Sequence, residues 1–203
     1  MTNFNQMRQN MILGQFLPGL IKDSEVLNHF EEFPREQFLP ENLRDISYSD
    51  LNIKIGQYRY IPSPFNTAQI FQEAKFKGNE VALLIGANYG YEAAIASKMV
   101  DTLIALEQDK NIKVVAQENL KKFNIENVVL ISDNHERGYK KLGPYDIIIS
   151  IDTSIIVKQE LLEQIAEGGK LMFCEKLTFG MKESKLNVFY KQNNKYIKEN
   201  LFD

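Results

Sequence analysis

The chain has 203 residues, of which 44% are hydrophobic, and this is enough to bury one substantial core. Its formal net charge is −3 and its lysines are interleaved with acidic residues, so a broad basic surface is excluded and no nucleic-acid partner is expected. The single cysteine, Cys174, excludes an internal disulfide, and the sequence has neither a signal-peptide core nor an apolar run of about 18 residues. We therefore expect a cytoplasmic protein without a membrane partner.

Two amphipathic helices are predicted near the N-terminus. Residues 3–20 place apolar side chains at helical spacing, and the pattern ends around a Pro-Gly pair. Asp23 is the predicted N-cap of the second helix, which ends before Pro34. Farther along, residues 43–64 are rich in Tyr, Ile and turn residues, and we interpret them as an irregular surface region rather than core.

Alternating strand and helix patterns fill most of the remaining chain. Apolar runs predict strands at residues 81–85, 103–106, 128–131, 146–151 and 170–173. Helical spacing predicts helices at residues 66–75, 91–99, 108–123 and 157–166. This alternation predicts an α/β fold with a mostly parallel sheet and right-handed crossovers.

The C-terminal part predicts an antiparallel hairpin that closes this sheet. Two strand-like runs, residues 186–190 and 196–202, are separated by a polar loop at residues 191–195. We therefore expect a single domain over residues 1–203. It consists of a helical and loop extension, residues 1–65, and a Rossmann-like core, residues 66–203.

The most informative segment is VALLIGANYGY, residues 81–91, in which an apolar strand leads into a glycine-containing turn and then a helix. Glycines after a buried strand let the backbone approach a ligand and expose the N–H groups at the helix start. A dinucleotide fingerprint would need a third glycine where Tyr91 stands, whereas Gly86, Asn88 and Gly90 match a Gly-x-Gly-x-Gly cradle at two of three positions. S-adenosyl-L-methionine therefore fits this turn better than NAD.

Acidic residues follow two later strands and extend the nucleotide-type pattern. Glu107 lies about 20 residues beyond Gly86, where a carboxylate can accept both hydroxyl hydrogens of a ribose diol. The alternative is that Glu107 only favours the positive end of the next helix. Asp133, at the end of the third strand, can accept a hydrogen from the adenine amine, or it can form a turn with Asn134.

Short segments along nearly the whole chain occur in the order found in one enzyme family. The N-terminal ones are RQNM (residues 8–11), DSEVL (23–27), FPREQFLP (33–40), YSD (48–50) and IGQ (55–57). The later ones are the cradle with YEAA (91–94), ALE (105–107), SD (132–133), YDII (145–148) and LLEQIAEGGKL (161–171). Together they resemble the protein-L-isoaspartate (D-aspartate) O-methyltransferase family.

The resemblance implies a class I methyltransferase sheet that binds S-adenosyl-L-methionine. The expected substrate is a protein or peptide with an isoaspartyl or D-aspartyl residue, whose carboxylate is methylated in a protein-repair reaction. A carboxylate oxygen attacks the activated methyl group directly, so alignment and desolvation supply most of the catalysis and no strong base is required. The expected donor-binding residues are Gly86, Asn88, Gly90, Glu107 and Asp133.

The loop that carries the family's catalytic serine departs from the family pattern. When Ile61 and Pro64 are matched to the family's TISQP segment, the serine position falls on Pro62. Ser63 is the nearest hydroxyl and becomes the candidate catalytic residue, and the alternative interpretation is a solvent-facing turn residue between prolines. A displacement of about 1 Å in an orienting group can lower a rate about a hundredfold.

The cradle departs as well, because Leu84 stands where the family carries a glutamate and Asn88 replaces the middle glycine. Asparagine adopts a left-handed backbone conformation more readily than other side-chain-bearing residues, so binding can be weakened without being lost. These departures leave two alternatives open: a non-catalytic descendant that acts as an interaction module, and a methyltransferase with a different acceptor.

The remaining reactive side chains point to no further chemistry. His29 and His135 are far apart in sequence and lack the spacing of metal ligands, so each is predicted to be a helix or loop histidine with ordinary partners, and no metal is expected. Cys174 ends an apolar run and is predicted to be a small buried hydrophobic residue.

Overall fold

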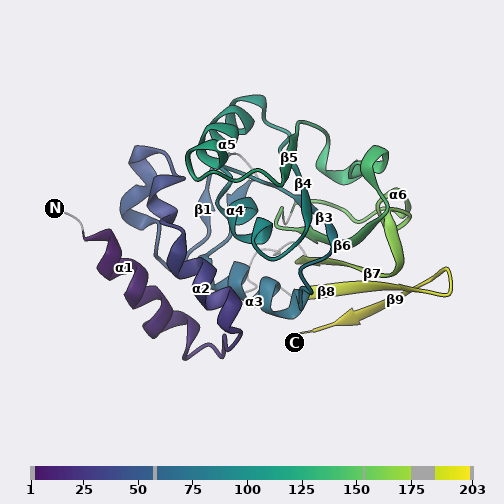
Figure 1. Cartoon of the computed structure of the whole chain (residues 1–203), viewed down its shortest axis with the longest axis horizontal. Helices are drawn as coiled ribbons and strands as arrows, with labels where there is room; N and C mark the ends of the chain where they lie inside the picture. Colours follow the sequence, from purple (N-terminus) through teal and green to yellow (C-terminus); the bar gives the residue numbers. More distant parts are fainter. Residues whose placement is uncertain (1–2, 57–58, 153, 175–185, 202–203) are drawn as a thin grey trace.

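A seven-stranded sheet runs through the computed structural model, which describes residues 3–56, 59–152, 154–174 and 186–201 (Figure 1). The strand order is β5-β4-β3-β6-β7-β8-β9, with β3 to β7 parallel to one another and β8 and β9 antiparallel. The strands span Val81–Ile85 (β3), Thr102–Leu106 (β4), Val128–Ile131 (β5), Tyr145–Ser150 (β6), Ile165–Cys174 (β7), Leu186–Gln192 (β8) and Lys195–Asn200 (β9). The predicted parallel sheet with an antiparallel hairpin at its end is confirmed.

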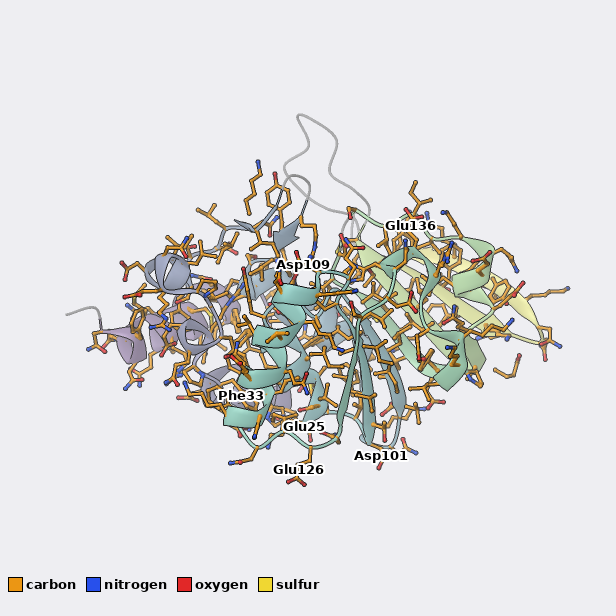
Figure 2. All side chains as sticks on the ribbon, turned by 90° about the horizontal axis from the view of Figure 1, so that it is seen from above. Glu25, Phe33, Asp101, Asp109, Glu126 and Glu136 are labelled. Atoms are coloured by element: carbon orange, nitrogen blue, oxygen red, sulfur yellow. The ribbon has the colours of Figure 1, made fainter. Side chains whose placement is uncertain are left out.

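The parallel strands gather their carboxyl ends along one edge of the sheet. Figure 2 shows Asp109 and Glu136, which follow β4 and β5, at one edge, and Asp101 and Glu126, which precede these strands, at the other. Strand β3 lies between β4 and β6, so the chain order reverses at this point. Ligands of open α/β sheets bind in the crevice at such a reversal, outside the carboxyl ends of the strands.

The helices follow the sequence prediction for most of their length. The core helices span Pro64–Ala74 (α3), Tyr91–Ser97 (α4), Lys110–Lys122 (α5) and Gln159–Leu162 (α6). At the N-terminus, α1 is Phe4–Met11, it continues as a π-helical segment at Ile12–Phe16, and α2 is Ser24–Glu32. Asp23 is the N-cap of α2 as predicted, because its side chain accepts hydrogen bonds from the backbone N–H groups of Glu25 and Val26. Across the described residues, no helix combines the length and apolar character needed to cross a membrane.

Side chains of the sheet alternate between two hydrophobic clusters. Leu84 of β3 joins the larger one, together with Phe30 of α2 and other residues of the N-terminal helices. Leu83 points to the opposite face and joins the smaller cluster with Leu161 of α6. Both faces are therefore covered, which explains why β3 is a continuous apolar run in the sequence.

Figure 1 shows α1 at the end of the molecule opposite to the turn between β8 and β9.

The prediction that residues 43–64 form a surface region rather than core is wrong for several of them. This segment contains a two-stranded antiparallel hairpin, with β1 at Ile53–Lys54 and β2 at Tyr60–Ile61. The isoleucine of each strand is buried against Leu39, and Tyr48 is buried in the main core. Turn residues predicted an irregular segment, but Tyr48, Ile53 and Ile61 are buried, whereas Ile46, Leu51 and Tyr60 are exposed as the prediction required.

Two other boundaries also need correction. The helix predicted at residues 157–166 is much shorter, because β7 already begins at Ile165. The loop predicted at residues 191–195 shrinks to the two residues Asn193 and Asn194, which both have positive φ angles, 51° and 58°. Two consecutive left-handed residues form the turn that matches the twist of a tight hairpin. Phe202, the last residue of the predicted hairpin, lies outside the described residues.

Candidate active site

The turn after β3 has the backbone conformation that a close ligand contact requires. Gly86 and Gly90 have φ angles of +91° and +93°, which side-chain-bearing residues rarely adopt. A Cβ atom added at Gly86 would lie only 3.1 Å from the backbone nitrogen of Asp152. Asn88 has a φ angle of 49°, so asparagine does hold the left-handed position where the family pattern has glycine. The turn is therefore preserved despite the substitution.

Glu107 lies directly beside this turn and is completely buried. Its Oε2 atom accepts the backbone N–H of Asn88 at 2.9 Å, and its Oε1 atom accepts the backbone N–H of Asp109 at 2.8 Å. The carboxylate thereby links the end of β4 to the turn after β3. Glu107 therefore lies beside the cradle, and its role toward a ribose stays a prediction.

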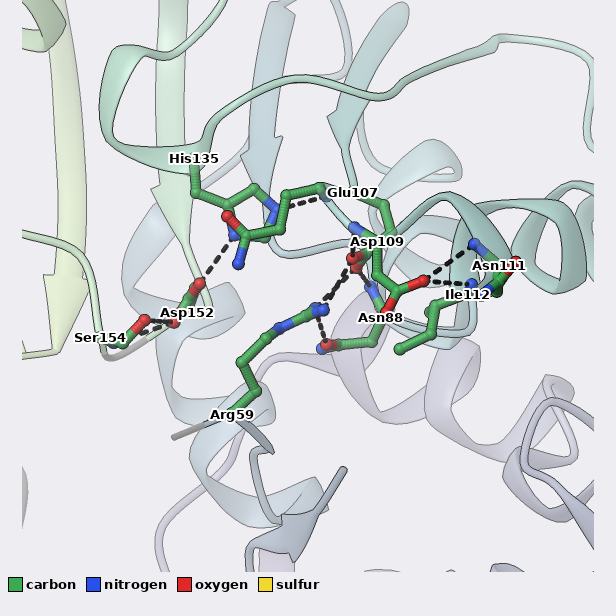
Figure 3. A network of polar contacts seen from close by, with 10 residues as sticks. Arg59, Asn88, Glu107, Asp109, Asn111, Ile112, His135, Asp152 and Ser154 are labelled. Atoms are coloured by element: carbon green, nitrogen blue, oxygen red, sulfur yellow. Dashed lines mark hydrogen bonds and ion pairs between the residues drawn. The ribbon is translucent and has the colours of Figure 1, made fainter. Parts of the chain in front are cut away.

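The side chain of Arg59 donates one further hydrogen bond to each oxygen of this carboxylate. Its Nη1 and Nη2 atoms donate to Oε1 and Oε2 of Glu107, each at 2.8 Å, and Nη2 also donates to Oδ1 of Asn88 at 3.1 Å (Figure 3). Arg59 directly precedes β2, and its carbonyl accepts the N–H of Ile55 at 3.0 Å. The β1–β2 hairpin thus brings a guanidinium into the predicted donor site.

A buried histidine connects two further strand ends. Nε2 of His135 accepts the backbone N–H of Gln108 at 3.1 Å, so the ring hydrogen sits on Nδ1 and is donated to Oδ2 of Asp152 at 2.7 Å (Figure 3). The prediction that His135 is a helix or loop histidine with ordinary partners is confirmed, since it begins the 3-10 helix His135–Arg137. Its ring fixes the turn after β4 relative to the end of β6.

Asp152 is held as an anion at this edge of the sheet. Burial alone would raise the pKa of its carboxyl group, but hydrogen bonds from His135 and Ser154 outweigh burial and lower the pKa to about 2. The contacts from Ser154 come from both its backbone N–H and its hydroxyl, at 2.9 Å and 2.6 Å. A negative charge therefore stands next to Gly86.

Asp133 lies at the end of β5, the strand next to β4. The backbone N–H of Glu107 donates to the carbonyl of Ile131 at 2.9 Å, so the ends of these strands are adjacent. The Asp133 side chain is exposed and accepts the N–H of Asn134 at 2.7 Å. It lines an open surface pocket of about 420 Å³ together with Tyr139. This placement is compatible with both predicted roles, contact with an adenine and a turn with Asn134.

Ser63 is buried, with 2% of its surface exposed, so the alternative that it is a solvent-facing turn residue is wrong. Its hydroxyl oxygen accepts the N–H of Asn66 at 3.2 Å and caps the N-terminus of α3. Its own N–H donates to the side chain of Asn52 at 2.9 Å. The neighbouring carbonyl of Pro62 accepts a hydrogen bond from the buried guanidinium of Arg35 at 2.7 Å. Ser63 is therefore held rigidly at the entrance of a core helix.

The sequence analysis did not identify Arg59 and Asp152 as residues of the candidate site. Arg59 stands in the loop that departs from the family pattern, and this departure could have indicated that the loop contacts the site differently. Asp152 follows an apolar strand in the same way as Glu107 follows β4, so its position at a strand end could have identified it. Leu84, which stands where the family carries a glutamate, is buried inside β3 and contributes to the core.

Comparison with known proteins shows the family to which the chain belongs. The sequence profile of protein-L-isoaspartate(D-aspartate) O-methyltransferases matches residues 6–202. The chain belongs to the protein-L-isoaspartate O-methyltransferase family. A relative from Syntrophobacter fumaroxidans, protein-L-isoaspartate O-methyltransferase 1, is 30% identical over 172 residues, which cover 85% of this chain and 80% of that protein.

Solved structures share the fold of this chain. A Plasmodium falciparum protein described as a protein-L-isoaspartate O-methyltransferase, in complex with S-adenosyl-L-homocysteine, aligns with a TM-score of 0.78 at 24% identity over 100% of this chain and 96% of that one. Another protein-L-isoaspartate O-methyltransferase aligns with a TM-score of 0.77 at 22% identity, and the match covers 95% of this chain and 62% of that longer chain. The fold is that of the class I methyltransferases.

Proposed function

We propose that this chain transfers a methyl group from S-adenosyl-L-methionine to the carboxylate of an isoaspartyl or D-aspartyl residue in a protein or peptide. Family membership over nearly the whole chain supports this activity. The observation that carries the proposal is the buried Glu107 carboxylate beside the left-handed turn of Gly86 and Asn88. A cytoplasmic location remains our proposal from the single cysteine and the sequence composition.

The residues of the site have the chemistry that this donor requires. Glu107 accepts two parallel N–H donors from Arg59, and a ribose diol presents two O–H donors to the same two oxygens. We propose that Gly86, Asn88 and Gly90 hold the donor along their backbone and that Asp133 receives the adenine amine. When bound, S-adenosyl-L-methionine would supply a methyl group activated by its sulfonium.

On the acceptor side, we propose that Ser63 orients the substrate carboxylate. The helix cap uses its oxygen as an acceptor, so its hydroxyl hydrogen can be donated to an anionic oxygen. The hydrogen bond from Arg35 to the Pro62 carbonyl supports the loop in which Ser63 lies. Orientation of this kind is sufficient, because a carboxylate attacks a sulfonium methyl group without losing a proton.

The test is transfer of a labelled methyl group from S-adenosyl-L-methionine to an isoaspartyl peptide. The matched control is the same peptide with an ordinary aspartyl residue, and the expected product is a base-labile methyl ester on the isoaspartyl peptide alone. Absence of labelling at saturating donor, while a characterised family member labels the same peptide, would refute the proposed function. Equal labelling of both peptides would refute the proposed acceptor.

A further inference from the structure

Arg59 occupies the site on Glu107 that the donor is proposed to use. We propose that Arg59 is an intramolecular competitor of the donor: its guanidinium takes the place of the ribose diol on Glu107 and thereby sets the affinity for donor and product. This inference rests on the proposed function, because it requires S-adenosyl-L-methionine to bind at Glu107.

The hydrogen bonds of Glu107 show why the two partners exclude each other. Each of its oxygens accepts one backbone N–H, from Asn88 or Asp109, and one N–H from Arg59. A carboxylate offers about four lone-pair positions, and these four donors fill them. A ribose diol can therefore bind only after the guanidinium has left.

The Arg59 contact is strong enough to matter in this competition. It is bidentate, with both distances at 2.8 Å, and the Glu107 side chain is fully buried while that of Arg59 is 15% exposed. Charge-assisted bonds of this geometry are about twice as strong as neutral ones, and burial limits screening by salt. The donor therefore has to replace a contact of considerable strength.

The architecture also allows Arg59 to leave without disturbing the sheet. The residue directly precedes β2 of a short hairpin, in which Ile53 pairs with Ile61 and Lys54 with Tyr60. Its backbone carbonyl accepts the N–H of Ile55, so the backbone can stay in place when the side chain moves. The two isoleucines anchor this hairpin in their own small cluster with Leu39, separate from the two clusters that pack on the large sheet. The guanidinium is already partly exposed, so it can reach solvent while the hairpin stays anchored.

The test compares binding of S-adenosyl-L-homocysteine to the full chain and to Arg59→Met by titration calorimetry. Methionine keeps most of the apolar stem and removes every N–H donor. We expect the variant to bind about tenfold more tightly, a change of about 1.4 kcal/mol, and to unfold at a lower temperature without ligand because Glu107 loses its ionic partner. Lys121→Met, which removes a positive charge at an exposed position of α5 outside the site, is the matched control and should change neither quantity.

A simple structural role for Arg59, or a contact between Arg59 and the ligand, would lower stability without raising affinity. Unchanged or weaker binding by Arg59→Met, with clear binding by the unmodified chain, would therefore overturn the inference and leave the proposed function intact. Absence of binding by both proteins would overturn the proposed function and the inference with it. If Arg59→Met does not fold, Arg59→Lys keeps the charge but loses the bidentate geometry, and a gain of several-fold is expected; no gain would overturn the inference.

Discussion

The guanidinium of Arg59 and the carboxylate of Glu107 form two parallel hydrogen bonds of 2.8 Å at the carboxyl end of β4. The two residues are 48 positions apart, and the contact joins the N-terminal extension to the half of the sheet that contains β3, β4 and β5. Because Glu107 is also bonded to the turn after β3, this single carboxylate connects three parts of the chain. Stability and donor binding are therefore expected to depend on the same group.

Replacing Glu107 with glutamine should destabilise the fold. The glutamine amide retains one acceptor oxygen, but its NH₂ group replaces the other oxygen and would face N–H donors that now donate to the carboxylate. Arg59 would also lose its charged partner. Removing one partner of a buried ion pair costs about 3 kcal/mol. Urea unfolding should show this loss for Glu107→Gln and almost none for Glu118→Gln on the exposed side of α5. Equal stability of the two variants would contradict the structural role assigned to Glu107.

Asn88 should tolerate glycine better than alanine. Its φ angle is 49°, and a left-handed conformation costs a residue such as alanine about 1–2 kcal/mol, whereas glycine adopts it without this penalty. Both substitutions remove the hydrogen bond to Arg59, so the difference between the two variants isolates the backbone term. In denaturant unfolding, Asn88→Gly is expected to have a higher free energy of unfolding than Asn88→Ala. The reverse order would show that the turn is not left-handed in solution.

The stabilising effect of Asp152 should disappear in acid. The pKa of its carboxyl group in the folded protein is about 2, below the value near 4 of an unfolded chain, so the ionised group stabilises the fold above pH 4. The contribution is about 2 kcal/mol at neutral pH and falls as the pH drops from 4 toward 2. The stability difference between the unmodified chain and Asp152→Asn should therefore shrink below pH 4. A difference that stays constant down to pH 3 would contradict the assigned charge state.

A series at Ser63 separates its two proposed roles. Threonine keeps both the helix cap and a hydroxyl, asparagine keeps the cap alone, and alanine keeps neither. Stability should fall by about 1 kcal/mol for Ser63→Ala, because the cap to Asn66 is lost. Threonine and asparagine keep the cap but add bulk at a buried position, so any loss of stability in these variants comes from packing. Methyl transfer to the isoaspartyl peptide should fall for both Ser63→Ala and Ser63→Asn and persist for Ser63→Thr. If transfer by Ser63→Asn equals that of the unmodified chain, Ser63 is a cap and not an orienting group.

Apolar periodicity was sufficient to predict the centre of the sheet. Strand β3 is buried on both faces, and its predicted range, residues 81–85, agrees with the structure. The beginning of β7 was missed: the predicted helix ended at residue 166 and the predicted strand began at residue 170, so Gly168 and Gly169 fell between them. In the structure the register with β6 shifts at this point and Gly168 has a φ angle of 79°, so the glycines mark an irregularity inside one strand.

Only those residues of the candidate site that directly follow a strand could be predicted from the sequence. Gly86, Asn88 and Glu107 follow strands directly, so their meeting at one edge follows from a parallel sheet. The partner of Glu107 could not be found in this way, because Arg59 comes from a hairpin whose position depends on packing against the N-terminal extension. The same holds for Asp152, whose contact with His135 depends on the path of the loop after β5.

The most direct test of the account is a crystal structure of the chain with S-adenosyl-L-homocysteine. We expect both ribose hydroxyls within hydrogen-bond distance of Glu107, the backbone of Gly86 and Asn88 beside the ligand, and the Arg59 guanidinium displaced from the carboxylate. A structure in which the ligand is bound elsewhere while Arg59 and Glu107 remain paired would contradict it.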